Sequence, residues 1–554
     1  MGAERKKDRN MTFNYSKQFN TKQTSQQNFV PGVKGQARNT AGGVAFKLDP
    51  MDQLDRFLIL GSESPTYYAS ASKLTKTNAK NIEKLIKSHG VDVVNRVVEI
   101  SVENRAPKND PAIFCLAMCA KLGDNDTRKA AYAALPKVCR IGTHLFQFAE
   151  AAEAFGGWGR GMRNAVANWY NCKSPEKLQY QVVKYKQREG WSHRDLLRLA
   201  HVKPITEQHG EIFKYVVTGE SDAVFEDESE NALWTIWACE QAKKAESVGE
   251  VVKLITDYNL PREVIPTAFL NHPQVWEALL QRMPMTAMIR NLGKMSSIGV
   301  IGSMNAGEKL VIEKLADKAV LEKARIHPLN VLNAMNIYNG GHGFRGSLSW
   351  TPSQRVVDAL DSAFYATFKH VEPTGKATLL ALDVSGSMGC GNLAGMPGIT
   401  PRVGSAAMAL VTAAVEKQYE VIGFTGGSRG SWGSSGVSKL AISPRQRLDT
   451  VLNTVSGLPF GRTDCALPMT WALENKLNVD TFVIYTDNET WCGNIHPFQA
   501  LKKYRQATGI PAKLVVVGMT ATEFTIADPS DPGMLDVVGF DSAAPSIISN
   551  FSKD

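Results

Sequence analysis

Hydroxyl and carboxyl side chains gather at the ends of predicted strands in the last third of the chain. The sequence DVSGS occupies residues 383–387 after an apolar segment, GRTD occupies 461–464, and Asp487 ends a second apolar segment. Because the carboxyl ends of parallel strands share one edge of a sheet, these side chains are expected to meet there. Five residues form the predicted site for a divalent cation: Asp383, Ser385, Ser387, Thr463 and Asp487.

The residue types at this site favour Mg²⁺, which binds about six oxygen ligands and keeps several water molecules. Ser385, Ser387 and Thr463 would ligate through neutral hydroxyls, whereas Asp383 and Asp487 would act largely through water or hydrogen bonds. Such a metal stays electrophilic and can accept an oxygen from an acidic protein ligand or from a phosphate. The alternative is structural: DVSGS would then be only a tight strand-to-helix turn with an Asx-type cap.

Enzymatic interpretations of this region fail on single residues. A phosphotransferase of the haloacid-dehalogenase type needs a second Asp two positions after Asp383, where Ser385 stands. A P-loop would need Ser or Thr after Gly375-Lys376, and Ala377 stands there. We also find no convergent cluster of acids that would suit a two-metal nuclease. The sequence therefore predicts a binding protein and not an enzyme.

Positive charge is concentrated in the first two thirds of the chain. The net charge is +9, yet residues 371–554 hold 14 Lys and Arg against 16 Asp and Glu, which leaves 49 against 38 for residues 1–370. The densest basic segment, residues 158–203, holds ten Lys and Arg and three acids. A polyanion such as a nucleic acid is expected to bind there.

Two predicted helices in this segment each align their basic side chains. Ser174-Pro175-Glu176 has the pattern of a helix start. On the helix that follows, Lys177, Lys184 and Arg188 fall within about 20° of one line. A basic row of this kind can contact the phosphates of an RNA backbone. The alternative is an ordinary solvated helix face.

A second predicted helix follows Ser192, whose capping box pairs it with Asp195. Arg194, Arg198 and His201 fall on one face of that helix, although His201 could simply complement the helix dipole. Arg160 and Arg163 precede both helices and complete the predicted RNA contacts. Among nearby aromatic residues Trp158, Trp169 and Tyr170 could stack bases, but the last two share an apolar face that favours the core.

The pattern of elements divides the chain into three parts. Residues 1–45 are polar and are expected to form a flexible tail. Residues 46–370 show helical periodicity almost throughout, which favours paired-helix repeats with a surface for an extended ligand. In residues 371–554 strands alternate with helices, which predicts a doubly wound parallel sheet. With no run of 18 apolar residues, no export signal and no CxxC pair among eight Cys, we expect free thiols and a cytoplasmic location.

Long motifs resemble one known family. KYKQREGWSHRDLLRLAHVKP (184–204), MPMTAMIRNLGKM (283–295) and GHGFRGSLSW (341–350) are similar to the TROVE domain of the Ro ribonucleoprotein family, and DVSGSM, GRTDCALPMTWA and YTDNET are similar to its von Willebrand factor A-type domain. The resemblance covers roughly residues 51–554. It implies a ring of HEAT-like helical repeats closed by an α/β A-type domain that carries a metal-ion-dependent adhesion site.

The resemblance also implies a function in RNA quality control. Members of the family bind small noncoding Y RNAs on the outer surface of the ring, through residues that match Lys184, Arg188 and His201. They bind misfolded noncoding RNAs by a single-stranded 3′ end, and bacterial members are expected to tether a 3′ exonuclease through Y RNA. The metal residues match Ser385, Ser387 and Thr463. The rival interpretation is a metal-dependent adhesion or scaffold module without an RNA function.

Overall fold

The structure is a computed structural model that describes residues 23–553 except 63–65, 67–68, 220–232, 344–345, 369–370, 427–435 and 459–460. Most of the described residues between 50 and 366 lie in helices, as the periodicity predicts. Side-chain caps begin many of these helices; Ser70, Asp124, Thr206 and Ser247 each accept a hydrogen bond from a backbone N–H of the first turn. The apolar stripe of each helix then packs on its neighbours.

The helices of this part are α2 (Pro50–Leu60), α3 (Ala71–Val102), α4 (Asp110–Leu122), α5 (Asn125–Val138), α6 (Gly142–Phe155), α7 (Arg160–Asn171), α8 (Pro175–Lys184), α9 (His193–Ala200), α10 (Glu207–Thr218), α11 (Trp234–Lys244), α12 (Val248–Tyr258), η2 (Arg262–Val264), η3 (Thr267–Asn271), α13 (Pro273–Arg282), α14 (Met285–Ser297), α15 (Ala306–Ala316), α16 (Lys318–Ala324), α17 (Pro328–Asn339) and α18 (Gln354–Ala366).

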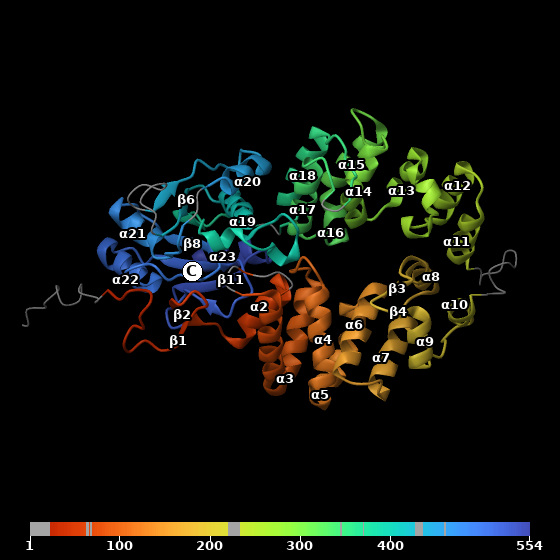
Figure 1. The fold of residues 1–554 in the computed structure, drawn as a ribbon, viewed down its shortest axis with the longest axis horizontal. Coiled ribbons are helices and arrows are strands. Elements are labelled where there is room, and N and C mark those ends of the chain that lie inside the picture. The colour runs from red at the N-terminus through yellow and green to blue at the C-terminus, as the bar shows by residue number, and fades with distance from the viewer. Residues whose placement is uncertain are drawn as a thin grey trace, which may run out of the picture.

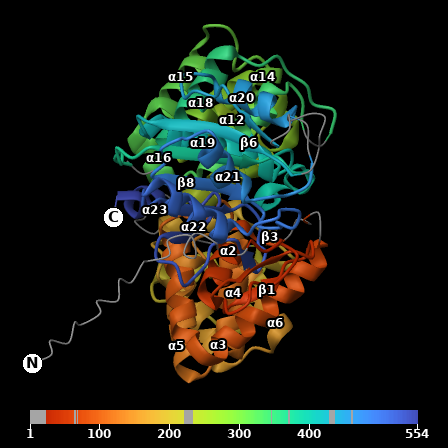
Figure 2. The same cartoon turned by 90° about the vertical axis from the view of Figure 1, so that its left-hand side faces the viewer.

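These helices pack as repeats along two arms. In the first arm α3 packs on α4 and α5, α4 on α6, α5 on α7, and α7 on α9; in the second α11 packs on α12, α12 on α13, and α17 on α18. The arms meet around α8, α10 and α11, far from the C-terminal domain (Figure 1). Viewed from its other end, the molecule places that domain between α15 and α18 on one side and α3 to α5 on the other (Figure 2). The predicted ring of HEAT-like repeats closed by an α/β domain is confirmed.

The C-terminal domain is built on a sheet with the strand order β11-β9-β8-β5-β6-β7. Its strands are parallel except for β7. Because the sheet is buried on both faces, the strands are continuous apolar runs in which apolar and polar residues do not alternate. The strands are β5 (Thr378–Asp383), β6 (Tyr419–Phe424), β7 (Val437–Lys439), β8 (Thr481–Thr486), β9 (Lys513–Gly518) and β11 (Met534–Val538), and the helices are α19 (Pro401–Val415), α20 (Leu448–Ser456), α21 (Leu467–Glu474), α22 (Pro497–Thr508) and α23 (Ala544–Lys553), with short turns η4 (Gly386–Gly389) and η5 (Leu393–Gly395).

Successive side chains of these strands enter two different cores. Leu380 and Leu382 of β5 belong to an apolar cluster that continues into the helical repeats, whereas Leu379 and Ala381 belong to a separate cluster beneath α21 and α22. The doubly wound sheet is therefore confirmed, and one of its faces shares its core with the ring.

The prediction of a flexible tail is wrong for residues 23–45. Strands β1 (Gln36–Arg38) and β2 (Val44–Lys47) form a hairpin, and β2 pairs with β10 (Phe524–Thr525) of the C-terminal domain. Val44 and Phe46 are buried there. The polar composition is misleading because the polar side chains of this segment bond to the C-terminal domain. Residues 1–22 lie outside the described part of the chain.

A buried polar junction closes the ring where both arms reach the C-terminal domain. Arg105, just after α3, pairs with Asp541 at 2.6 Å between Nη2 and Oδ2, and both side chains are buried. The carbonyl oxygen of Arg105 accepts hydrogen bonds from His327 Nε2, at 3.1 Å, and from the backbone N–H of Ser542. Burial lowers the pKa of His327 to about 4, so this imidazole stays neutral and donates. A second ion pair lies in the same interface, where Arg56 Nη2 is 2.6 Å from Asp536 Oδ1.

The described residues bear on two further expectations. All eight Cys are free thiols, and Cys115 and Cys119 lie in the core, as predicted. Within the described residues, no helix combines the length and apolarity needed to cross a membrane.

Replacement of Asp541 is expected to weaken ring closure. Asp541→Ala leaves the buried Arg105 guanidinium without its main partner, and breaking such a pair costs about 3 kcal/mol. We expect a lower urea midpoint by circular dichroism. Asp126→Ala is the matched control, because Asp126 pairs with Lys129 and both side chains are 79% exposed. Equal midpoints for the two variants would show that the junction does not hold the ring.

Candidate nucleic-acid interface and metal centre

Helix α7 presents two of the predicted RNA contacts while it packs by its other face. Arg160 and Arg163 are exposed. Trp169 and Tyr170 are fully buried, and a 2.8 Å hydrogen bond joins Tyr170 Oη to His193 Nδ1. These two rings therefore support the surface from within, as their shared apolar face indicated, and they do not face a ligand.

Helix α8 starts as predicted but ends before Arg188. Ser174 caps it, Lys177 is exposed and Lys184 is its last residue. The predicted helical row through Arg188 is therefore wrong. Gln187–Arg188 (β3) pairs with Trp191–Ser192 (β4) across Glu189-Gly190, both of which have positive φ. This two-residue loop has the geometry of a type I′ hairpin turn, which takes Arg188 off the helix and leaves it exposed.

Helix α9 confirms the capping box but not the predicted row of three. Ser192 and Asp195 cap each other's backbone N–H groups, and Arg194 and Arg198 are exposed one turn apart. The helix ends at Ala200, and His201 adopts a left-handed conformation with φ of 51°. His201 therefore leaves the helix face, and its exposed imidazole projects from the C-cap.

The predicted RNA contacts lie together at one end of the molecule, on α7, α8, α9 and the β3–β4 hairpin (Figure 1). All of them are exposed except Lys184, which is half-buried. Burial lowers the pKa of Lys184, but Tyr180, Tyr185 and Glu263 outweigh this effect, so the net shift is upward and the ammonium stays charged. The sequence patterns missed Arg262 and Arg282, which line a cleft beside Lys184.

The predicted metal ligands converge at the carboxyl edge of the parallel sheet. Asp383 ends β5; its Oδ1 accepts the backbone N–H of Ser385 at 2.9 Å, and its Oδ2 accepts the hydroxyl of Thr486 at 2.7 Å. The hydroxyl oxygens of Ser385 and Ser387 lie 3.1 Å apart. These bonds fix the first two hydroxyls beside the first carboxylate.

Backbone bonds bring the other two segments to the same place. Gly386 N–H donates to the carbonyl of Gly461, and the carbonyl of Thr463 accepts the backbone N–H groups of Trp491 and Cys492. The residues brought together are all buried: Asp383, Ser385, Ser387, Thr463 and Asp487. The structure therefore brings the segments that carry these five buried side chains to one edge of the sheet.

The electrostatics of this cluster suit a hard cation. Burial, with repulsion from Asp383 and Glu489, raises the pKa of Asp487 to about 8, and burial also raises the pKa of Asp383. Arg402 donates hydrogen bonds to the backbone carbonyls of Val384 and Ser385, so its guanidinium is directed at the backbone beneath the cluster. Two buried carboxylates with three hydroxyls fit the oxygen ligands of Mg²⁺. Within the described residues no group of three or more His, Cys, Asp or Glu could hold a metal ion, so a cation at this edge would depend on the three hydroxyls as well as on the two carboxylates.

The N-terminal segment supports this edge of the sheet, which sequence reasoning missed. Gln26 is fully buried; its Nε2 donates to Asp464 Oδ1 at 2.7 Å, and its Oε1 accepts the Thr490 hydroxyl at 2.5 Å. Asn39 Nδ2 donates to the carbonyl of Thr490, and a Cβ on Gly43 would lie 1.9 Å from that oxygen. The loop after Asp487 is thus held from outside. The close approach of this backbone at Gly43, which leaves no room for a side chain, is the one signal that the sequence offered.

Comparisons with known proteins identify the family. A model of the TROVE domain matches residues 37–340, and a model of the Ro60 vWA domain matches residues 377–552. The chain belongs to the Ro60 family. The limits of these matches fall near the predicted domain boundaries, which remain predictions.

Relatives of the Ro60 family match nearly the whole chain. The RNA-binding protein RO60 of Deinococcus radiodurans is 42% identical over 520 residues, covering 94% of this chain and 95% of the relative. The RNA-binding protein RO60 of Caenorhabditis elegans is 39% identical, covering 93% and 90%. The crystal structure of the D. radiodurans Ro (RSR) protein aligns with a TM-score of 0.68 and 41% identity, over 91% of this chain and 99% of that one. The names of these relatives describe binding and indicate no catalysis.

Magnesium is expected to stabilise the A-type domain. A ligand at about 100 times its Kd adds about 2.7 kcal/mol to the free energy of unfolding. We expect the thermal unfolding midpoint to rise when Mg²⁺ replaces EDTA, and Ser387→Ala to abolish most of that rise. Ser456→Ala, on α20, is the control and should respond as wild type. A wild-type midpoint that ignores Mg²⁺, Mn²⁺ and Ca²⁺ would contradict the metal site.

Proposed function

We propose that this protein is an RNA-binding protein of RNA quality control. It would hold small noncoding Y RNAs on the surface formed by α7, α8, the β3–β4 hairpin and α9, and take misfolded noncoding RNAs by their single-stranded 3′ ends. The observation that carries the proposal is the group of exposed cations on capped, well-packed elements at one end of the ring. Two relatives that are named as RNA-binding proteins support it.

The geometry suits backbone contact more than base reading. Arg194 and Arg198 lie one turn apart on α9, while Arg188 is carried by a tight hairpin beside it. Cations on rigid elements bind phosphates without ordering long loops, so less entropy is lost on binding. Binding of this kind is tolerant of sequence and weakens steeply as salt rises.

Further partners belong to the same proposal. A 3′ exonuclease would be tethered through a bound Y RNA, and the metal centre, with Mg²⁺, would accept an acidic side chain from a protein ligand. We place the protein in the cytoplasm. The second candidate function, a metal-dependent adhesion or scaffold module without RNA, draws its support from the five converging side chains at the sheet edge.

A gel-shift titration with a hairpin RNA that bears a single-stranded 3′ tail tests the proposal. Lys184→Ala/Arg188→Ala should weaken binding roughly ten- to hundredfold, because hydrogen bonds to charged groups contribute about 1.5–3 kcal/mol. The slope of log affinity against log salt should also fall, by about 1 to 2.

Lys502→Ala/Lys503→Ala is the matched control, because it removes two exposed lysines from α22 at the opposite end of the molecule. Its affinity should remain at the wild-type value, and bound RNA should stay uncut with Mg²⁺ present. Undetectable wild-type binding at low salt would refute RNA binding and favour the adhesion module.

A further inference from the structure

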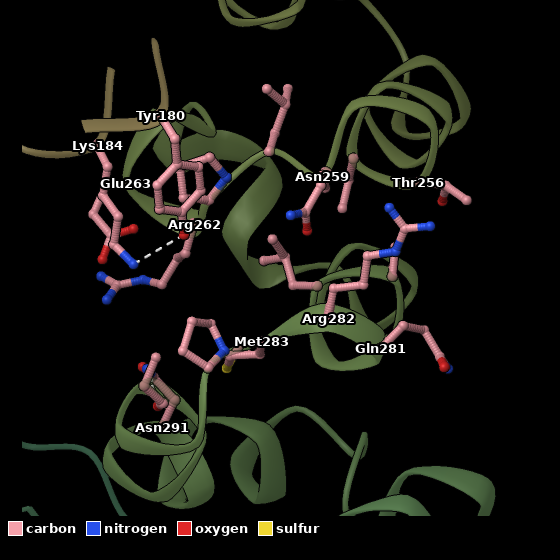
Figure 3. A pocket seen from close by; sticks show the side chains of 17 residues that line it. Tyr180, Lys184, Thr256, Asn259, Arg262, Glu263, Gln281, Arg282, Met283 and Asn291 are labelled. Carbon is pink, nitrogen blue, oxygen red and sulfur yellow. Dashed lines mark hydrogen bonds between the residues drawn. The ribbon is translucent and has the colours of Figure 1, made fainter. Parts of the chain in front are cut away.

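A cleft lies between the end of α8 and the segment that runs from α12 to α14. Tyr180 and Lys184 enter it from α8, and the rest of its lining comes from residues 255–291 (Figure 3). The space that it encloses is about 70 Å³, so a ligand in this cleft would be only partly enclosed and would lie partly in solvent.

Cationic side chains stand on both sides of the cleft. Figure 3 places Lys184 and Arg262, with Glu263, on one side, and Arg282 with Asn259 on the other. Lys184 Nζ donates to Tyr180 Oη at 3.2 Å, and the Arg262 guanidinium carbon lies 5.9 Å from the centre of the Trp276 ring. These contacts hold two of the three cations in place.

The middle of the cleft is apolar and is bordered by amide groups. Met283, Leu279 and Ile255 are buried beneath it, and the Tyr180 ring forms part of its wall. Asn259 caps α12 with φ of 51°, a left-handed conformation that Asn tolerates better than most residues. That conformation sets the amide at the rim, where it can pair with a polar edge.

We propose that this cleft binds one unpaired nucleotide of an RNA strand. A nucleotide within a strand has a flat base, apolar on its faces and polar at its edges, on a sugar with a phosphate on each side, and the cleft has cations on both flanks of an apolar floor. Aromatic and apolar surfaces bind unpaired bases without strong sequence preference. The inference rests on the proposed RNA binding, and it goes further by assigning this cleft to unpaired RNA. An acidic peptide is the competing occupant, but its carboxylates would leave the apolar surface in the middle of the cleft without a partner.

The test compares unpaired and paired RNA on the full chain. Fluorescence anisotropy would follow a labelled short oligouridylate and, separately, a blunt hairpin. Arg282→Ala should weaken oligouridylate binding about tenfold, which corresponds to about 1.4 kcal/mol, and leave hairpin binding unchanged. Lys177→Ala, on the exposed face of α8 and outside the cleft, should weaken the hairpin more than the oligouridylate.

Each outcome decides between the two ideas. If wild type binds the hairpin but Arg282→Ala and Asn259→Ala bind oligouridylate normally, the cleft assignment is wrong and the RNA function stands. Equal loss for both RNAs would also reject a site for unpaired nucleotides, and no binding of either RNA would reject both ideas. As a readout independent of mutation, photocrosslinking of 5-bromouridine RNA should label peptides that contain Tyr180 or Met283. Labels confined to other peptides would overturn the inference.

Discussion

The ring depends on the buried junction at Arg105. Its side chain pairs with Asp541 while its carbonyl oxygen takes hydrogen bonds from His327 and Ser542, so one residue joins the first arm, the second arm and the C-terminal domain. Each group satisfies another, which is the condition under which buried polar groups can be tolerated. The arms also meet at the far end, where α8 packs on α10 and α11, so the basic elements lie on a frame that is joined at both ends.

Two sites of different chemistry therefore share one frame. The carboxyl edge of the sheet gathers buried oxygen ligands, where acids repel one another and a hard cation would relieve them. The opposite end of the molecule presents cations on exposed helices. There the negative charges of a phosphate backbone would offset the repulsion between these cations. The apolar core that runs from one sheet face into the repeats connects the two ends mechanically.

How much the sequence could predict follows from the range of the interactions involved. The meeting of DVSGS, GRTD and Asp487 at one edge was predictable because strand ends of a parallel sheet must share an edge, and the caps at Ser174 and Ser192 were predictable because they are local. Arg188 and His201 were misplaced because helical spacing does not reveal where a helix ends. In the structure the turn at Glu189-Gly190 takes Arg188 off the helix. The cleft and the N-terminal strands were invisible because they join residues about one hundred to more than four hundred positions apart.

The hairpin β1–β2 has a consequence for how the chain is made. Gln26 bonds to Asp464 across 438 positions, so the ribosome produces one partner long before the other. During synthesis at about 5–20 residues per second, the hairpin would wait tens of seconds for β10 and the loop it supports. Contacts of such sequence separation form late and slowly. The early segment would thus act as a final latch, and premature release of the chain would leave an unpaired strand edge exposed to aggregation.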